Sequence, residues 1–69
     1  MMKFEGCIKE ANYVNDIGEM KKIVVYPMKD DKYPFSLWSM RTGDFCGSGE
    51  ITKEEVNDFF QHYGIAESI

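Results

Sequence analysis

The sequence predicts an α+β fold in which a four-stranded antiparallel meander carries one C-terminal helix on one face (ββββα). Segments rich in β-branched and aromatic residues alternate with short polar stretches that contain Gly, Asn or Asp, as in strands joined by tight turns. Residues 52–64 combine a helix start signal, an apolar stripe of helical period and a terminal glycine. At 69 residues the chain has room for one domain, which we expect to span 1–64, with 65–69 as a short C-terminal tail.

The first strand is expected within residues 2–10, where Phe4, Gly6 and Ile8 alternate with charged residues and a cysteine. A turn follows at Asn15-Asp16-Ile17-Gly18, because Asn and Asp tolerate left-handed backbone and Gly adopts positive φ freely. The apolar residues before and within this turn have two interpretations. They either extend the first strand or pack as a short lid over the core: Tyr13, Val14 and Ile17.

The second strand is predicted at residues 21–28, where the run Ile23–Tyr26 is typical of a strand covered at least partly on both faces. Pro27 cannot donate a ladder hydrogen bond, so it marks an edge, a bulge or the end of the strand. A polar loop at 29–33 leads to the third strand at 35–41. The antiparallel meander follows because successive strands are joined by short loops.

The third strand places Phe35 and Leu37 on one face and Trp38 and Met40 on the other. After a tight turn at 42–44, the fourth strand is expected at Phe45–Ile51. Its alternating glycines, Gly47 and Gly49, would let the helix or a neighbouring strand approach closely.

The helix has unusually complete sequence signals. Thr52 is the expected N-cap, and Glu55 completes a capping box three residues later. Gly64 is a natural residue for the position that ends the helix. Positions i, i+3, i+4 and i+7 form one apolar stripe, which is expected to cover one face of the sheet: Val56, Phe59, Phe60 and Tyr63.

Charge is unevenly distributed along the chain. The formal net charge is −4. Residues 1–41 hold seven basic and six acidic side chains, whereas residues 42–69 hold one basic side chain, Lys53, and six acidic ones. An acidic chain is not expected to be a general nucleic-acid binder or to dock on an anionic membrane. The acidic segment is either a solvated helix face or a docking face for a basic partner.

The sequence indicates no enzyme and no cofactor. His62 has Asp58 one turn earlier but no evident nucleophile, so it is interpreted as a surface histidine. Cys7 and Cys46 are isolated and are expected to be free thiols packed as small hydrophobes, which also argues against zinc. Gly47-Ser48-Gly49 lacks the remainder of a phosphate-binding motif. No apolar run long enough to span a membrane and no signal-peptide core is seen, so we expect a cytoplasmic protein.

A single helix cannot cover both faces of a sheet, so an apolar surface is expected opposite the helix. If Phe35 and Leu37 face the helix, this surface contains Tyr26, Trp38 and Met40, residue types favoured at protein interfaces. In the alternative register Trp38 lies in the core and Phe35 and Leu37 lie outside. The predicted partner-binding residues are Tyr26, Trp38 and Met40 together with three acidic helix residues: Glu54, Glu55 and Asp58. They predict a non-enzymatic protein-binding module, expected to be a homodimer, that occupies the basic surface of a protein partner.

In size, acidity and organisation the chain resembles the small accessory proteins of bacteriophages and mobile elements, and this resemblance implies an accessory or inhibitor role. The alternative function is a sheet that binds single-stranded nucleic acid by stacking bases on Tyr26 and Trp38. The cations for that function would come from the same strands and their flanks: Lys21, Lys22, Lys29, Lys32 and Arg41.

Overall fold

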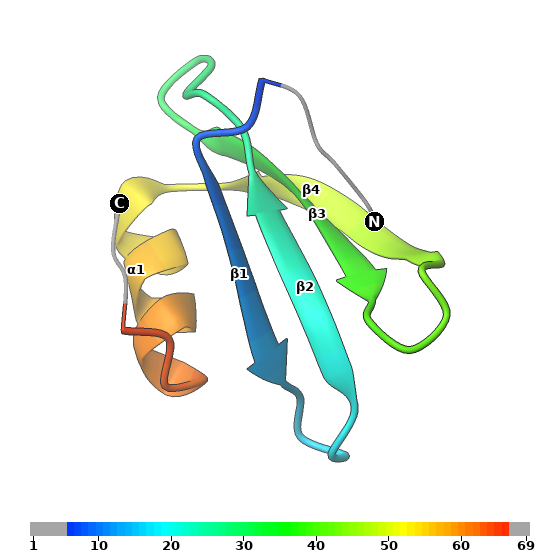
Figure 1. Cartoon of the computed structure of the whole chain (residues 1–69). Helices are drawn as coiled ribbons and strands as arrows, with labels where there is room; N and C mark the ends of the chain where they lie inside the picture. Colours follow the sequence, from blue (N-terminus) through cyan, green and yellow to red (C-terminus); the bar gives the residue numbers. More distant parts are fainter. Residues whose placement is uncertain (1–5, 67–69) are drawn as a thin grey trace.

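The computed structural model describes residues 6–66 and confirms the predicted fold (Figure 1). Four antiparallel strands form one sheet in the order β1-β2-β3-β4, and one helix follows them. Each strand therefore pairs with its neighbour in sequence. The elements are β1 (Lys9–Val14), β2 (Met20–Val25), β3 (Tyr33–Ser39), β4 (Phe45–Ile51) and α1 (Lys53–His62).

The first strand lies further along the chain than the alternation in residues 2–10 suggests. Residues 6–8 are not part of a strand, and the predicted position of Phe4 lies outside the described residues. Instead β1 continues to Val14, one of the two expected alternatives. The pairing of Ala11 with Ile23 and of Tyr13 with Lys21 fixes its register and brings both β1 side chains into the core.

The β1–β2 turn forms where Asn15 and Gly18 predict it. The Asn15 side-chain oxygen accepts the backbone N–H of Ile17 at 3.1 Å and that of Glu19 at 2.9 Å. Gly18 adopts a φ of +83°, a conformation that costs glycine little. Local side-chain chemistry therefore closes this hairpin.

The β2–β3 connection is a tight turn with two residues at positive φ. Asp30 and Asp31 have φ values of 52° and 65°, and Lys29 and Lys32 exchange backbone hydrogen bonds of 2.7 and 3.0 Å across them. Pro34 then occupies the second position of β3. Its carbonyl accepts the N–H of the residue that follows β2, and its missing N–H removes one bond only where β2 has already ended.

The β3–β4 pair contains a register shift between Leu37 and Trp38. Gly49 lies opposite Phe35, and a Cβ at this position would meet the Phe35 ring at 3.1 Å. A Cβ at Gly47 would meet nothing within 4 Å. Only Gly49 therefore serves close packing, and its close neighbour is the side chain of an adjacent strand.

Helix α1 begins and ends as its sequence signals predict. The Thr52 hydroxyl accepts the Glu55 N–H, and the Glu55 carboxylate accepts the Thr52 N–H, both at 3.2 Å. Gly64 has a φ of +69°. The N–H of Gly64 bonds the Gln61 carbonyl at 3.2 Å and that of Ile65 bonds the Phe60 carbonyl at 2.8 Å, which together form a Schellman motif.

The hydrophobic core lies between α1 and the face of the sheet that carries Phe35 and Leu37. Its buried residues are Ala11, Tyr13, Ile23, Val25, Val56 and Phe60, and partly buried neighbours include Phe35, Leu37, Ile51, Phe59, Tyr63 and Ile65. Tyr13 contacts the rings of Phe59 and Tyr63, with centroid distances of 5.1 and 4.7 Å. These ring contacts join β1 to α1, which lie next to each other at the left of Figure 1. The helix stripe is confirmed as the inner face.

Candidate binding surface

The face of the sheet opposite α1 is organised in rows of cross-strand neighbours. Side chains that pair across an antiparallel sheet share one face. Val14 pairs with Met20, and the Met40 N–H donates to the Met20 carbonyl at 3.0 Å, so these three side chains form one row. The neighbouring row contains Trp38 and Phe45, which pair directly across the β3–β4 ladder.

Within residues 6–66, a hydrogen bond and a ring contact help to hold Trp38 in place. Its indole N–H donates to the Ser36 hydroxyl at 2.8 Å, and its ring meets the Phe45 ring edge-on at a centroid distance of 5.3 Å. The hydrogen bond satisfies the polar atom of a partly buried indole. Trp38 is therefore oriented on this face, as its alternation with Leu37 predicted.

The two rows together form an apolar patch near the ends of the β1–β2 and β3–β4 hairpins. Val14 is 50% exposed, Met20 51% and Phe45 57%, whereas Trp38 and Met40 are partly exposed. Further along the same face, Val24 and Ser36 are buried. The side chains of the two rows thus lie together at one end of the face, and we call them the apolar patch: Val14, Met20, Trp38, Met40 and Phe45. Other exposed apolar side chains lie outside the patch, among them Ile8 at 47% and Met28 at 48%.

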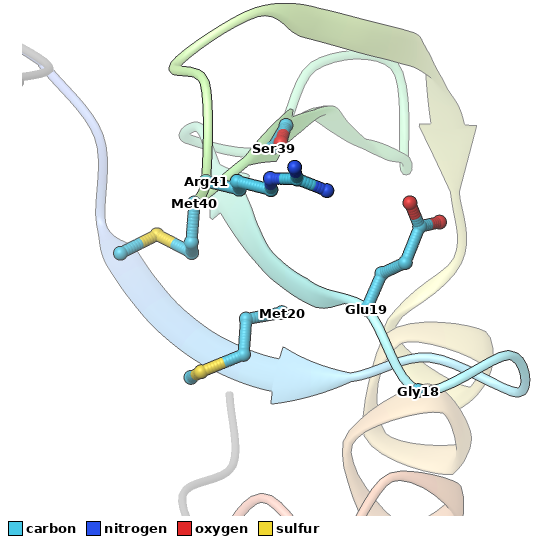
Figure 2. Close-up of a pocket in the computed structure, with 6 residues that line it drawn as sticks. All are labelled: Gly18, Glu19, Met20, Ser39, Met40 and Arg41. Carbon is cyan, nitrogen blue, oxygen red and sulfur yellow. The ribbon is translucent and has the colours of Figure 1, made fainter.

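A shallow hollow of about 350 Å³ adjoins the apolar patch. Figure 2 shows Met20 and Met40 side by side, and the Arg41 guanidinium pointing toward the Glu19 carboxylate on the other side of the hollow. Gly18 and Ser39 complete its lining. The hollow therefore offers a methionine wall beside a pair of opposite charges, a lining suited to an apolar side chain with a polar neighbour.

The lysines near the patch are already paired with carboxylates. Lys22 Nζ lies 3.2 Å from Glu10, and Lys21 Nζ lies 3.7 Å from Glu19. Lys21 also lies 3.5 Å from the Cys46 sulfur. The Lys22–Glu10 pair reduces the positive potential around Trp38, because Lys22 is the cross-strand partner of Trp38, whereas Lys21 pairs with Ser39 on the α1 face of the sheet.

Tyr26 does not belong to the apolar patch. It follows the last residue of β2, and its N–H bonds Pro34 at the far end of β3. The row that contains Val24 and Ser36 lies between Tyr26 and Trp38, and both of these residues are buried. The predicted group of Tyr26, Trp38 and Met40 is thus divided, and the last two form a surface with residues that the prediction omitted.

The predicted acidic residues lie on the helix, on the side of the sheet opposite the apolar patch. Glu54, Glu55 and Asp58 are all exposed. Hydrogen bonds from the Thr52 backbone and side chain lower the pKa of Glu55, so this carboxylate has a structural role as a cap. A flat partner surface cannot contact the acidic helix face and the apolar patch together.

The residues considered for catalysis remain separate. His62 lies 3.9 Å from Asp16 in an exposed pair, and its ring packs against Tyr63. Cys7 and Cys46 are free thiols, and Cys46 is exposed, whereas the sequence suggested a packed position. Cys46 is exposed because it lies at the register shift on the outer strand.

The part of the chain that the structure describes holds neither a cluster of metal ligands nor a membrane-spanning helix. Residues 6–66 contain no cluster of three or more His, Cys, Asp or Glu side chains that could hold a metal ion. The helix in this range is too short and too polar to cross a membrane.

Three residues of the apolar patch were missed by the sequence interpretation: Val14, Met20 and Phe45. Val14 was assigned either to the strand or to a lid, and Met20 falls just before the predicted second strand. Phe45 joins Trp38 through the register shift, which no local signal indicates. One sequence signal could have indicated these residues: several large apolar residues flank the β1–β2 and β3–β4 turns.

The comparisons with known proteins give no relative: no family model, curated protein or solved structure matches the chain.

Proposed function

We propose that this chain is a small non-enzymatic protein-binding module whose apolar patch contacts the basic surface of a protein partner. The observation that carries this proposal is the concentration of Val14, Met20, Trp38, Met40 and Phe45 at one end of the face opposite α1. Three of these side chains are half exposed or more. Trp, Met and Phe are enriched in the buried centres of protein interfaces and depleted from ordinary surfaces.

Charge supports a basic partner. The net charge of −4 favours encounter with a positively charged protein over long distances. Glu54 and Asp58 contribute to this field from the other side of the sheet, so their role is to steer the encounter while the patch makes the contact. Such a module acts by occupying its partner, as an accessory or inhibitor protein of a bacteriophage or mobile element would.

The cytoplasm is the proposed compartment, because the chain carries free thiols and a surface suited to a basic intracellular partner. The homodimer stays a prediction. A second copy would bring another net charge of −4 to the interface, and this repulsion opposes self-association.

Binding of single-stranded nucleic acid is less well supported. Trp38 and Phe45 offer stacking surfaces, and Arg41 lies close by. However, Lys22 is paired with Glu10 and Lys21 with Glu19, so the cations needed along a phosphate backbone are partly neutralised.

The test compares two methionines of similar exposure. Met20 is 51% exposed inside the patch, whereas Met28 is 48% exposed outside it. Tagged wild type, Met20→Lys and Met28→Lys are used to capture proteins from a lysate of the source cells, and the captured protein is purified and titrated by calorimetry. We expect Met20→Lys to weaken binding at least about tenfold and Met28→Lys to leave it unchanged. Equal effects of the two substitutions contradict the proposal.

The nucleic-acid alternative is tested with the same proteins. The chain has one tryptophan, so Trp38 fluorescence reports directly on the patch. Quenching by a short single-stranded oligonucleotide at low salt, lost as salt rises, would replace the proposed protein partner with nucleic acid.

A further inference from the structure

The outer edge of the sheet at β4 presents unpaired backbone groups. In an antiparallel ladder, the N–H and C=O of one residue point to the same side, and successive residues alternate. The hydrogen bonds of Tyr26 to Pro34 and of Met40 to Met20 show that the even residues of β3 face β2. The backbone N–H and C=O groups of Phe35 and Leu37 therefore point toward β4 and face its inner side.

The same alternation applies to β4. Gly49 and Gly47, which pair with Phe35 and Leu37, direct their backbone groups toward β3. The N–H and C=O groups of Ser48 and Glu50 consequently point away from the sheet. Within residues 6–66, β4 is the last strand of the order and no strand pairs with this side.

The two edge strands of the sheet, β1 and β4, differ in how well they are protected against pairing with another strand. The β1 edge carries Lys9 and lies beside the residues that follow α1, because Glu10, Ala11 and Asn12 share a hollow with Gly64–Ala66. The β4 segment 45–51 contains neither lysine nor proline, the residues that commonly protect an edge against pairing. Its edge is suited to the addition of a strand.

Gly47 adjoins the register shift in the β3–β4 pair. Its φ is not among the positive values of the described glycines, and a Cβ there would lie in open space. A strand glycine marks either a bulge or the close approach of another backbone. The register shift accounts for the first of these, and the open space beside Gly47 leaves room for the second.

Gly47 leaves an open position without a side chain on the α1 side of the sheet, which we call the shelf, whereas the Phe35 ring already covers Gly49. The partly buried side chains of Leu37 and Phe35 border this shelf, because they pair with the two glycines. On the opposite face, the same strand presents Ser48 and Glu50. A strand added here would meet apolar surface on one face and a hydroxyl and a carboxylate on the other.

We propose that the β4 edge, residues 46–50, binds an extended basic segment of the protein partner, which adds to the sheet as an antiparallel fifth strand. This inference rests on the proposed protein-binding function and specifies how part of the partner is recognised. Backbone bonds to Ser48 and Glu50 supply affinity, and alternate side chains supply specificity. An apolar side chain of the segment lies over Gly47, beside the Phe35 ring that covers Gly49, and a lysine or arginine lies opposite Glu50.

Charge favours such a segment over a second copy of this chain. Pairing of two β4 strands about Ser48 would place Glu50 of each copy opposite Cys46 of the other, with Asp44 as its diagonal neighbour, and the strand carries no basic residue to offset these charges. Diagonal neighbours across strands lie within reach of each other, so this arrangement of like charges is unfavourable. A basic segment removes this repulsion and complements the −5 formal charge of residues 42–69.

The test blocks the edge without altering the sheet. Ser48→Pro removes an N–H that points outward, so the bonds between β3 and β4 remain. Asn12→Pro is the matched control, because its N–H points outward from the β1 edge, as the bond of Asn15 to Glu19 on the same strand pair indicates. Wild type and both variants, with folding verified by circular dichroism, are each used to select from a library of random seven-residue peptides.

We expect wild type and Asn12→Pro to enrich peptides that alternate apolar with basic residues. An enriched peptide should bind Ser48→Pro at least about tenfold more weakly than wild type. Absence of enrichment on wild type, or equal binding to Ser48→Pro, overturns the inference. Gly47→Val gives a second measurement without proline, because its side chain fills the shelf, and unchanged peptide binding by this variant also counts against it.

The outcome is distinguishable from that of the proposed function. If Met20→Lys weakens capture of the partner and Ser48→Pro does not, the apolar patch stands and the edge inference fails. If sedimentation detects a dimer that Ser48→Pro converts to monomer, a second copy occupies the edge and the assignment to a basic partner segment is wrong.

Discussion

The two glycines of β4 are expected to respond oppositely to the same substitution. An alanine Cβ at position 49 would lie 3.1 and 3.2 Å from two atoms of the Phe35 ring, closer than ordinary van der Waals contact. The same Cβ at position 47 would lie in open space. Gly49→Ala should therefore destabilise the protein, and Gly47→Ala should stabilise it.

The magnitude follows from two opposing terms. Replacing a strand glycine with alanine raises the free energy of unfolding by about 0.5–1 kcal/mol, mainly because alanine restricts the unfolded chain. Overpacking costs about 1–3 kcal/mol, and Phe35 lies toward the lower end because it is only partly buried. We take about 1.5 kcal/mol for the displacement of the ring, so Gly49→Ala loses roughly 0.5–1 kcal/mol. The two variants should then differ by about 1.5 kcal/mol.

Urea unfolding followed by Trp38 fluorescence measures this difference. With a denaturant slope of about 1 kcal/mol per molar, the two midpoints should be separated by roughly 1.5 M. The control is the Phe35→Leu background, in which the ring is absent and both alanine variants should gain stability equally. Midpoints that coincide in the wild-type background, or a difference that persists in Phe35→Leu, would refute the assignment of Gly49 to ring packing.

Further outcomes concern the caps, the core and the β2–β3 turn. Thr52→Ala should lower the stability by about 1 kcal/mol in thermal melts, because the N-cap hydroxyl is lost. Hydrogen bonds from Thr52 lower the pKa of Glu55 below its ordinary 4.5. The stability that the ionised Glu55 contributes is therefore present above pH 4.5 and is lost as the pH falls through the folded-state pKa. Glu55→Gln should remove this loss of stability at acid pH when unfolding is measured as a function of pH. Burial, followed by the neighbouring Tyr63 and Cys46, raises the pKa of Tyr13 above 10. The stability that the neutral Tyr13 contributes is therefore complete below pH 10 and is lost as the pH rises through the raised pKa. In an alkaline titration followed by tyrosinate absorbance, Tyr13→Phe should lack the step at the highest pH. Asp31→Gly should gain about 1 kcal/mol in urea unfolding by relieving a non-glycine residue at a φ of 65°, and no gain would contradict this assignment of strain.

Local signals allowed much of the fold to be predicted. The fourth strand and both ends of the helix agree with the sequence, because Thr52, Glu55 and Gly64 act on backbone groups within a few residues of themselves. The position of β1 could not be predicted in the same way. The alternation within residues 2–10 does not show where the strand ends, and within the described residues it is pairing with β2 that places β1 at Lys9–Val14.

The candidate site was predicted less completely, because its residues lie on different strands and become neighbours only through the pairing of those strands. Alternation separated Trp38 from Phe35 and Leu37 but left open which of the two faces the helix covers, and packing of α1 on Phe35 and Leu37 decides this. The inclusion of Phe45 depends on the register shift of β4, and the separation of Tyr26 depends on where β2 ends. Register is a property of strand pairs, so a single strand does not reveal which side chains will be neighbours across the sheet.

The simple strand order also has a consequence for how the chain reaches its native state. Every strand pairing joins consecutive segments, so the sheet can form hairpin by hairpin with little loss of entropy in closing loops. The contact of Tyr13 with Phe59 and Tyr63 is different, because it unites the first strand with the last element. Docking of α1 is therefore expected as the final folding step. Until that step the inner face of the sheet is open to water, which makes the helix the element that protects a newly made chain from aggregation.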